Sequence, residues 1–252
     1  MPFTFSHPAI VLPFKHWRPK WFSATGLITG SVAPDFLYFI EMDGRADFGH
    51  TLAGIFFFDL PFSCLLAIVF HRWVRNPFLL HLPAPLDRKY AGHLDFRFPV
   101  YLRKHWPVFV LSVLLGAISH IGWDYFGSPR GQLFYLAPSF FNQYVFLLGT
   151  RLRLYLLIER IGSALGLAFL GIAAWQAGKP AGGAPPAPNE SKWVYWLSLL
   201  TATLLFTGLK FWFDPDISRL GHVVLIITSA ACYAVGFVTA LYAWLAAPPA
   251  HG

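Results

Sequence analysis

The sequence predicts an all-α integral-membrane protein, a polytopic bundle of five or six transmembrane helices. Of its 252 residues, 56% are hydrophobic and only 12% are charged, about half the charged share of an average soluble domain. The mean hydropathy of +0.52 points the same way, because a soluble fold would need more polar residues to cover its surface. Lipid is therefore the expected solvent for much of the chain.

The individual spans follow from apolar windows, since a spanning helix needs about 20 largely apolar residues. Four windows clearly reach this length and are largely apolar: 51–70, 106–125, 193–213 and 222–247. A fifth, 154–175, carries Glu159 and Arg160 near its start. A sixth, 21–40, contains Pro34 and Asp35 and is the doubtful span, which leaves five or six helices.

A polar tract rich in proline and glycine divides the chain. Its sequence, GKPAGGAPPAPNESK, is typical of a flexible linker. We therefore predict a core over 1–177 with a candidate polar or metal site, a linker over 178–192, and a C-terminal transmembrane hairpin over 193–252.

The net charge of +7 comes mostly from one predicted loop after Phe70. Its basic residues are Arg72, Arg75, Arg88, Lys89, Arg97, Arg103 and Lys104, against two acids, Asp87 and Asp95. This bias predicts a cytoplasmic loop facing anionic lipid, and it argues against nucleic-acid binding. We expect a multi-pass protein of the cytoplasmic (inner) membrane, with the lipid bilayer as its main partner and no nucleic acid. If successive helices cross the membrane in alternate directions from this loop, His50 and Asp124 lie on the opposite side of the membrane.

Several kinds of site have no support in the sequence. Cys64 and Cys232 lie in separate apolar runs, so neither a disulfide framework nor a thiolate zinc site is encoded. The segment MPFTFSHPAIVLPFKHW lacks the basic start and apolar run of a cleavable signal peptide. No P-loop, GxGxxG or GxSxG pattern occurs, so we expect no nucleotide cofactor and no serine-hydrolase elbow.

The most informative stretch for chemistry is SHIGWDYF, in which His120 and Asp124 are four residues apart. This spacing puts both side chains on one face of a helix, one turn apart. Such a pair can bind one divalent metal, or the carboxylate can orient the imidazole. Alternatively, the two side chains are a polar pair that caps a helix end at the membrane interface.

Three more candidates occur in the same half of the chain. Asp35, in GSVAPDF, is an acid in a semi-apolar segment, where an ionisable group is costly and indicates function; the alternative is a loop acid just outside the bilayer. His50, in FGHTLAG, opens the first strong helix, and its alternative is an interfacial histidine. His7, in FSHPA, precedes a proline and should project from extended backbone, although a surface role is the simpler explanation.

Four motifs follow one another along the chain: MPFTFSHPA, GSVAPDF, GHTLAG with FDLP downstream, and SHIGWDYF. Taken in this order, they resemble the DUF4184 family of uncharacterised bacterial and archaeal membrane proteins. The resemblance runs from Met1 to about Gly166. That family is similar, in its His, Asp, His, HxxxD order, to membrane-bound metal-dependent hydrolases of the YdjM type and, more remotely, to zinc-dependent phospholipase C and P1 nuclease.

The resemblance implies a metal-binding set of His7, Asp35, His50, His120 and Asp124, with Asp35 as a further ligand or catalytic general base. It implies a divalent metal, zinc or manganese by the nature of these ligands, that activates water to hydrolyse a phosphoester of a lipid-like substrate.

Two features of the sequence run against this function. Related sequences often continue the WDxF segment with Thr-His, whereas Gly127 and Ser128 stand there in this chain. If 21–40 spans the membrane, His7 lies on the cytoplasmic side, away from His50; a common site requires this segment to be re-entrant or interfacial. The alternative function is a non-catalytic accessory or structural subunit, with other membrane proteins as partners.

Asp59 is an acid in the middle of the first strong helix. Nine residues separate it from His50, which predicts nearly the opposite azimuth on a regular helix. We expect it to face the bundle interior and to pair with Arg160 or to cap the helix at Pro61.

Overall fold

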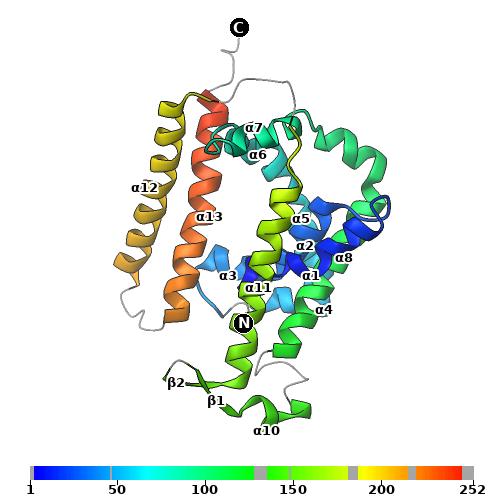
Figure 1. The fold of residues 1–252 in the computed structure, drawn as a ribbon, viewed down its shortest axis with the longest axis vertical. Helices are drawn as coiled ribbons and strands as arrows, with labels where there is room; N and C mark the ends of the chain where they lie inside the picture. Colours follow the sequence, from blue (N-terminus) through cyan, green and yellow to red (C-terminus); the bar gives the residue numbers. More distant parts are fainter. Residues whose placement is uncertain are drawn as a thin grey trace. The chain divides into compact units, whose positions relative to one another are not determined.

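The computed structural model describes residues 3–45, 47–127, 135–147, 149–180, 187–214 and 220–245. These residues are mostly helical, as predicted (Figure 1). In chain order the helices are η1 (Thr4–Ser6), α1 (Pro8–Trp17), α2 (Ala24–Val32), η2 (Ala33–Asp35), α3 (Phe36–Glu41), η3 (Phe48–His50), α4 (Leu52–Gly54), η4 (Ile55–Asp59), α5 (Leu60–Val69), η5 (Phe70–Val74), α6 (Arg75–Leu80), α7 (Leu86–Tyr90), η6 (Ala91–His93), α8 (Phe98–Gly127), α10 (Pro138–Phe141), α11 (Leu154–Gln176), α12 (Asn189–Phe213) and α13 (Leu220–Leu245).

Five helices are long and apolar enough to cross a membrane, so the chain is a multi-pass membrane protein. They are Leu52–Leu80, Phe98–Tyr125, Leu154–Gln176, Asn189–Phe213 and Leu220–Leu245. Each overlaps one of the five stronger predicted windows, and three of these windows lie entirely within a helix: 106–125, 154–175 and 193–213. Segments 46, 128–134, 148, 181–186, 215–219 and 246–252, together with residues 1–2, lie outside the described part; they include Ser128 and the middle of the predicted linker.

The doubtful sixth window, 21–40, is a broken segment in the structure. Ser23 begins α2 by accepting a hydrogen bond from the Gly26 amide, and α2 ends after nine residues. Pro34 lies in the short 3-10 helix η2 that follows, and α3 adds six residues. A proline removes a backbone donor and disrupts a regular helix, so this segment is two short helices joined at Ala33–Asp35.

The first span is longer than predicted. It runs from Leu52 to Leu80 and includes two π-helical turns, η4 and η5. Arg72 and Arg75, which we expected in the basic loop, therefore lie within this helix. Arg75 is buried and donates to the carbonyl oxygens of Phe96 at 2.7 Å and Leu94 at 3.1 Å, so it ties two segments of protein together and does not face lipid.

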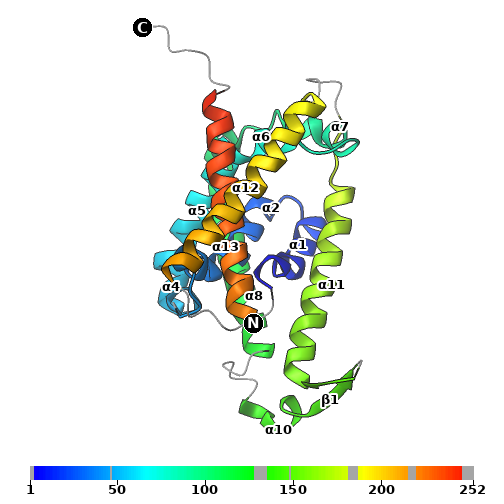
Figure 2. The ribbon, with the colours of Figure 1, turned by 90° about the vertical axis from the view of Figure 1, so that its left-hand side faces the viewer.

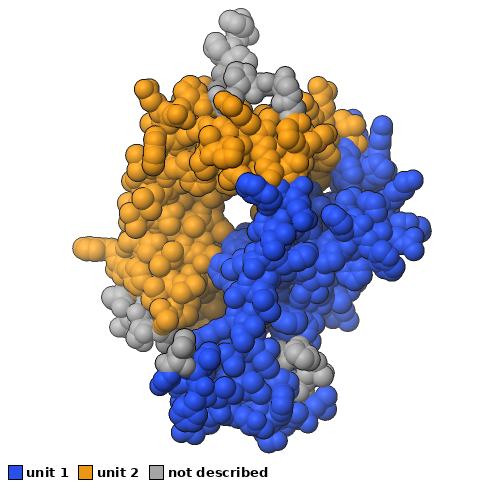
Figure 3. Space-filling view, viewed as in Figure 1, with its two compact units in different colours: residues 1–36, 47–65, 101–176 blue, residues 37–46, 66–100, 177–252 orange. Residues whose placement is uncertain are grey.

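The described chain forms two compact units whose segments alternate along the sequence (Figure 3). Unit 1 contains residues 1–36, 47–65 and 101–176, and unit 2 contains residues 37–46, 66–100 and 177–252. In unit 2, α12 and α13 lie side by side as an antiparallel pair (Figure 1). The predicted division into core, linker and hairpin stays a prediction, although α12 already begins at Asn189.

In unit 1, α2 packs against α8 at a distance that only glycine permits. A Cβ on Gly30 would lie 2.1 Å from the Val113 carbonyl oxygen, and a Cβ on Gly116 would lie 2.6 Å from the Leu27 carbonyl oxygen. Small residues allow two helix backbones to touch in this way. The contact holds Ser31, near the end of α2, against the helix that carries His120 and Asp124.

Unit 1 also contains the two-stranded sheet. Strands β1 (Tyr144–Leu147) and β2 (Thr150–Arg153) are antiparallel, with Tyr144 opposite Arg153 and Phe146 opposite Arg151. Helix α11 begins directly after β2, and the hairpin lies at that end of the helix in both views (Figures 1 and 2).

Candidate metal centre

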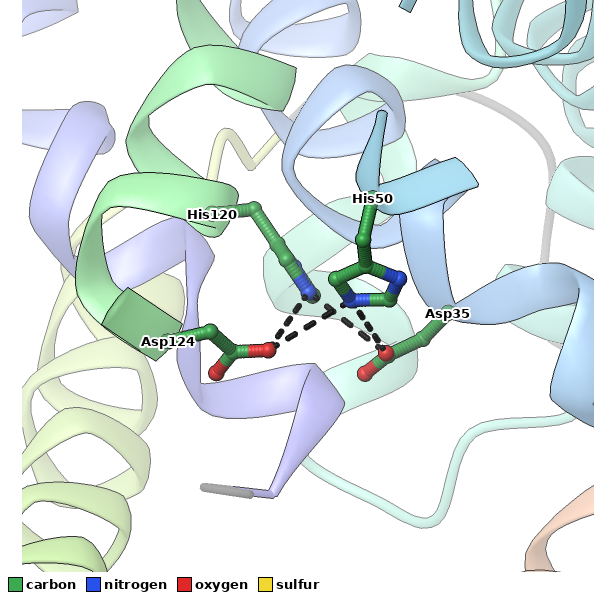
Figure 4. A group of neighbouring side chains, drawn as sticks. All are labelled: Asp35, His50, His120 and Asp124. Carbon is green, nitrogen blue, oxygen red and sulfur yellow. Dashed lines mark ion pairs between the residues drawn. The ribbon is translucent and has the colours of Figure 1, made fainter. Parts of the chain in front are cut away.

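Four of the predicted side chains converge in unit 1: Asp35, His50, His120 and Asp124 (Figure 4). One ligand atom from each lies within 4.8 Å of those of the other three. Asp35 ends the 3-10 helix η2, His50 ends the 3-10 helix η3, and the other two side chains project from the last turns of α8. His120 and Asp124 therefore lie on one face of α8, as expected.

The distances within this cluster are uniform. His50 Nε2 lies 3.3 Å from Asp35 Oδ1 and 3.4 Å from Asp124 Oδ2. His120 Nε2 lies 3.5 Å from each of the same two oxygens. Charge-assisted N–H···O bonds are shorter, about 2.7–2.9 Å. Ligands about 2.0–2.1 Å from a tetrahedral metal are about 3.4 Å apart, so these four separations suit a shared cation.

The fifth predicted residue, His7, also lies in the cluster. Its Nε2 is 3.3 Å from Asp124 Oδ1, and its ring stacks on that of His120 with centroids 3.9 Å apart. His7 is therefore not separated from the other candidates, as it would be if 21–40 spanned the membrane. The physical reason is the interrupted α2 and α3 segment, which lets the N-terminal turn pack inside unit 1.

Backbone carbonyls orient two of the imidazoles. His120 Nδ1 donates to the Ser31 carbonyl at 2.7 Å, and His7 Nδ1 donates to the Thr4 carbonyl at 3.1 Å. With its proton held at Nδ1, a neutral imidazole presents the Nε2 lone pair, which is the form that binds metal. His120 Nε2 faces both carboxylates, and His7 Nε2 faces that of Asp124.

The carboxylate Asp35 is oriented by a residue that the sequence did not reveal. Thr4 Oγ1 donates a hydrogen bond to Asp35 Oδ2, which leaves Oδ1 facing the histidines. Within the described part of the chain, Asp35 Oδ1, His120 Nε2 and Asp124 Oδ2 are buried and have no hydrogen-bond partner. Buried polar atoms are normally satisfied, and a cation bound between these three atoms would satisfy them. Thr4 stands three residues before His7 in TFSH, a spacing too common to single it out.

The turn that carries His50 reaches Asp35 because Gly49 has no side chain. A Cβ on Gly49 would lie 2.5 Å from the Pro34 carbonyl oxygen. The next helix then begins at Thr51, whose hydroxyl accepts from the Gly54 amide at 2.9 Å. The proline and the glycine in these two motifs thus bring Asp35 and His50 together.

His50 is the most accessible member of the centre. Its side chain is 14% exposed, against 4% for Asp35, 7% for Asp124 and 0% for both His7 and His120. Of these five side chains, His50 is therefore the one most open to an entering ligand.

The charges of the centre alter the acidity of Asp35 and His50, which lie outside the spanning helices. Burial lowers the pKa of His50, but the carboxylates of Asp124 and Asp35 outweigh this effect and raise the pKa to about 9. Burial raises the pKa of Asp35, but His120 and His50 hold it well below its usual range. Without a cation, His50 is therefore protonated at neutral pH.

Metal uptake should consequently depend on pH. Below pH 9 a metal must displace the proton of His50, so we expect affinity to rise with pH, by up to about tenfold per unit, and to level off near pH 9. Calorimetric titration with zinc in two buffers of different ionisation enthalpy measures the proton released. An affinity that is constant between pH 6 and 9 would contradict the expectation.

Asp59 faces the interior of the protein, as predicted, but it does not pair with its expected partner. It is fully buried at the end of the π-helical turn η4, and neither of its carboxylate oxygens has a hydrogen-bond partner among the described residues. No ion pair with Arg160 forms among the described residues, so the expected pairing is wrong. The π-turn, which changes the azimuth of a regular helix, and the 3-10 turn at His50 leave Asp59 close enough for the charges of His50, His120 and Asp35 to act on it.

Comparison with known proteins gives a family but no activity. The model of the domain of unknown function DUF4184 matches residues 1–246. The chain belongs to the DUF4184 family. The match extends past Gly166, where the resemblance seen in the sequence ends, and so includes α12 and α13. Neither a search of curated proteins nor a search of solved structures finds a match.

Proposed function

We propose that this DUF4184 protein is a membrane-embedded, metal-dependent hydrolase that acts on a phosphoester of a lipid-like substrate. The observation that carries the proposal is the convergence of Asp35 Oδ1, His50 Nε2, His120 Nε2 and Asp124 Oδ2 at separations of 3.3–3.5 Å between imidazole and carboxylate. Two carboxylates balance the charge of one divalent ion, and nitrogen and oxygen ligands favour zinc or manganese.

The residues of the chain divide into two groups in this proposal. Asp35, His50, His120 and Asp124 hold the metal, which supplies Lewis-acid activation of water and of the phosphoryl group. Thr4 and the carbonyl of Ser31 orient Asp35 and His120, and His7 orients Asp124 or adds a fifth ligand. Asp35, which lies next to the accessible His50, is counted here as a further ligand; the alternative role for it is the general base.

The lipid-like nature of the substrate rests on where the centre lies. His120 and Asp124 belong to the last turns of a candidate membrane span, and His50 lies two residues before the start of another. A centre at the ends of spanning helices lies near the level of lipid headgroups, where phosphoesters occur. We place the protein in the cytoplasmic (inner) membrane, with the centre on the non-cytoplasmic side, because the basic residues flank the other ends of these spans.

Hydrolysis by the purified protein tests this proposal. The protein is stripped with a chelator, reloaded with zinc or manganese, and given phosphomonoester and phosphodiester lipids in mixed micelles. We expect phosphate or headgroup release that requires the metal and fails in His120→Ala. Retained metal with no turnover of any lipid would favour the accessory-subunit function.

Removing the hydroxyl of Thr4 tests the orienting role directly. Thr4→Val keeps the shape of the side chain but no longer donates to Asp35, so we expect metal affinity to fall about 10–100-fold, as for other residues that orient a ligand. Thr4→Ser should retain most of the affinity. Thr228→Val is the matched control, since Thr228 is only partly buried and its hydroxyl donates to the Val224 carbonyl of its own helix. Equal affinity in Thr4→Val and wild type would contradict the role.

A further inference from the structure

We propose that the β1–β2 hairpin is a docking surface for anionic lipid headgroups. The surface is one face of the hairpin, formed by Tyr144, Phe146, Arg151 and Arg153, and we call it the cationic face. It goes beyond the proposed function and does not depend on a metal.

The register of the strands places these four side chains together. Tyr144 pairs with Arg153 and Phe146 with Arg151, and residues two apart on a strand share a face. The Arg151 guanidinium lies 3.8 Å from the centroid of the Tyr144 ring, and that of Arg153 lies 5.4 Å from it. All four residues are exposed, with Phe146 at 75%.

The charges of the cationic face are not neutralised. Neither arginine forms an ion pair with a carboxylate of the described residues, and the sequence from 135 to 153 contains no acid. Arg153 donates from Nη1 to Asn142, which leaves its other guanidinium donors available. Arginine presents these donors in a planar fork that matches phosphate oxygens, so the complementary partner is a phosphate.

The position of the hairpin favours the phosphate of a lipid headgroup as the partner. Arg153 is followed directly by Leu154, the first residue of a candidate membrane span, so the hairpin lies at the depth of the headgroups. The residues before it are also exposed and apolar: Tyr135, Leu136 and Phe140. Aromatic residues beside arginines at the end of a span are typical of contact with the membrane interface.

A fluorophore on the hairpin reports this contact locally. Thr150 is exposed and lies on the opposite face, so Thr150→Cys, in a background with Cys64→Ala and Cys232→Ala, carries an environment-sensitive dye without touching the arginines. The full chain is placed in nanodiscs of phosphatidylcholine with increasing phosphatidylglycerol. We expect the emission to shift as the anionic fraction rises and to return at high salt.

Variants that remove or keep the two arginine charges test the proposed docking of anionic lipid. In Arg151→Gln/Arg153→Gln we expect the apparent affinity for phosphatidylglycerol to fall about fivefold per arginine, and in Arg151→Lys/Arg153→Lys we expect it to stay within about threefold of wild type. Both variants should melt and bind zinc like wild type, which separates this result from a failure of the metal centre. Identical titrations for the glutamine variant and wild type, or an equal response to phosphatidylcholine, would overturn the proposal.

Discussion

Asp124→Asn should lower metal affinity by at least about 1,000-fold and remove metal-dependent hydrolysis. Asp124 contacts three imidazoles: its Oδ1 lies 3.3 Å from His7 Nε2, and its Oδ2 lies within 3.5 Å of His50 and His120. Asparagine has the same size but lacks the charge that offsets a divalent ion, and a buried cation without its counter-charge is costly.

The matched control is Asp95→Asn, which removes the charge of an exposed aspartate elsewhere in the chain. Zinc affinity of both variants is measured by competition with a chromogenic chelator in the same detergent. An Asp124→Asn protein that binds zinc within tenfold of wild type would show that this carboxylate is not a ligand.

Gly30→Ala should destabilise the protein by about 3 kcal/mol and weaken the metal centre with it. The new Cβ would lie 2.1 Å from the Val113 carbonyl oxygen and 2.7 Å from its Cα, so backbone, not a flexible side chain, must move. Separating α2 from α8 also moves the Ser31 carbonyl away from His120 Nδ1.

Gly122→Ala provides the matched control on α8. Nothing lies within 4 Å of a Cβ at Gly122, so alanine should leave stability unchanged or raise it by up to about 1 kcal/mol. Thermal unfolding in detergent, with and without zinc, compares the two variants. Equal melting temperatures for Gly30→Ala and Gly122→Ala would contradict the close contact between α2 and α8.

The sequence predicted the spans because their signal is local. Twenty apolar residues define a helix in lipid whatever its neighbours, so all five stronger windows coincide with helices of the structure. Their ends were harder to place. Arg72 and Arg75 looked like loop residues by charge, yet the helix continues to Leu80 because the carbonyls of Phe96 and Leu94 satisfy Arg75.

The candidate centre was only partly predictable for the opposite reason. The spacing of His120 and Asp124 fixes their common face within one helix, but the meeting of His7, Asp35 and His50 depends on close backbone contacts. Gly30 against Val113 and Gly49 against Pro34 create those contacts, and no periodicity in the sequence encodes which glycine meets which carbonyl. Thr4 was missed because a threonine hydroxyl acquires a role only once its partner, Asp35, is in place.

Metal analysis of the detergent-purified protein tests the central claim most directly. Wild type, His120→Ala/Asp124→Ala and the control His105→Ala/Asp95→Ala, whose residues are exposed, are dialysed against a weak chelator and measured by elemental mass spectrometry. We predict near-stoichiometric zinc or manganese in wild type and in the control, and loss in the first variant. Absence of metal from wild type, or equal retention in all three proteins, would contradict a metal centre at Asp35, His50, His120 and Asp124.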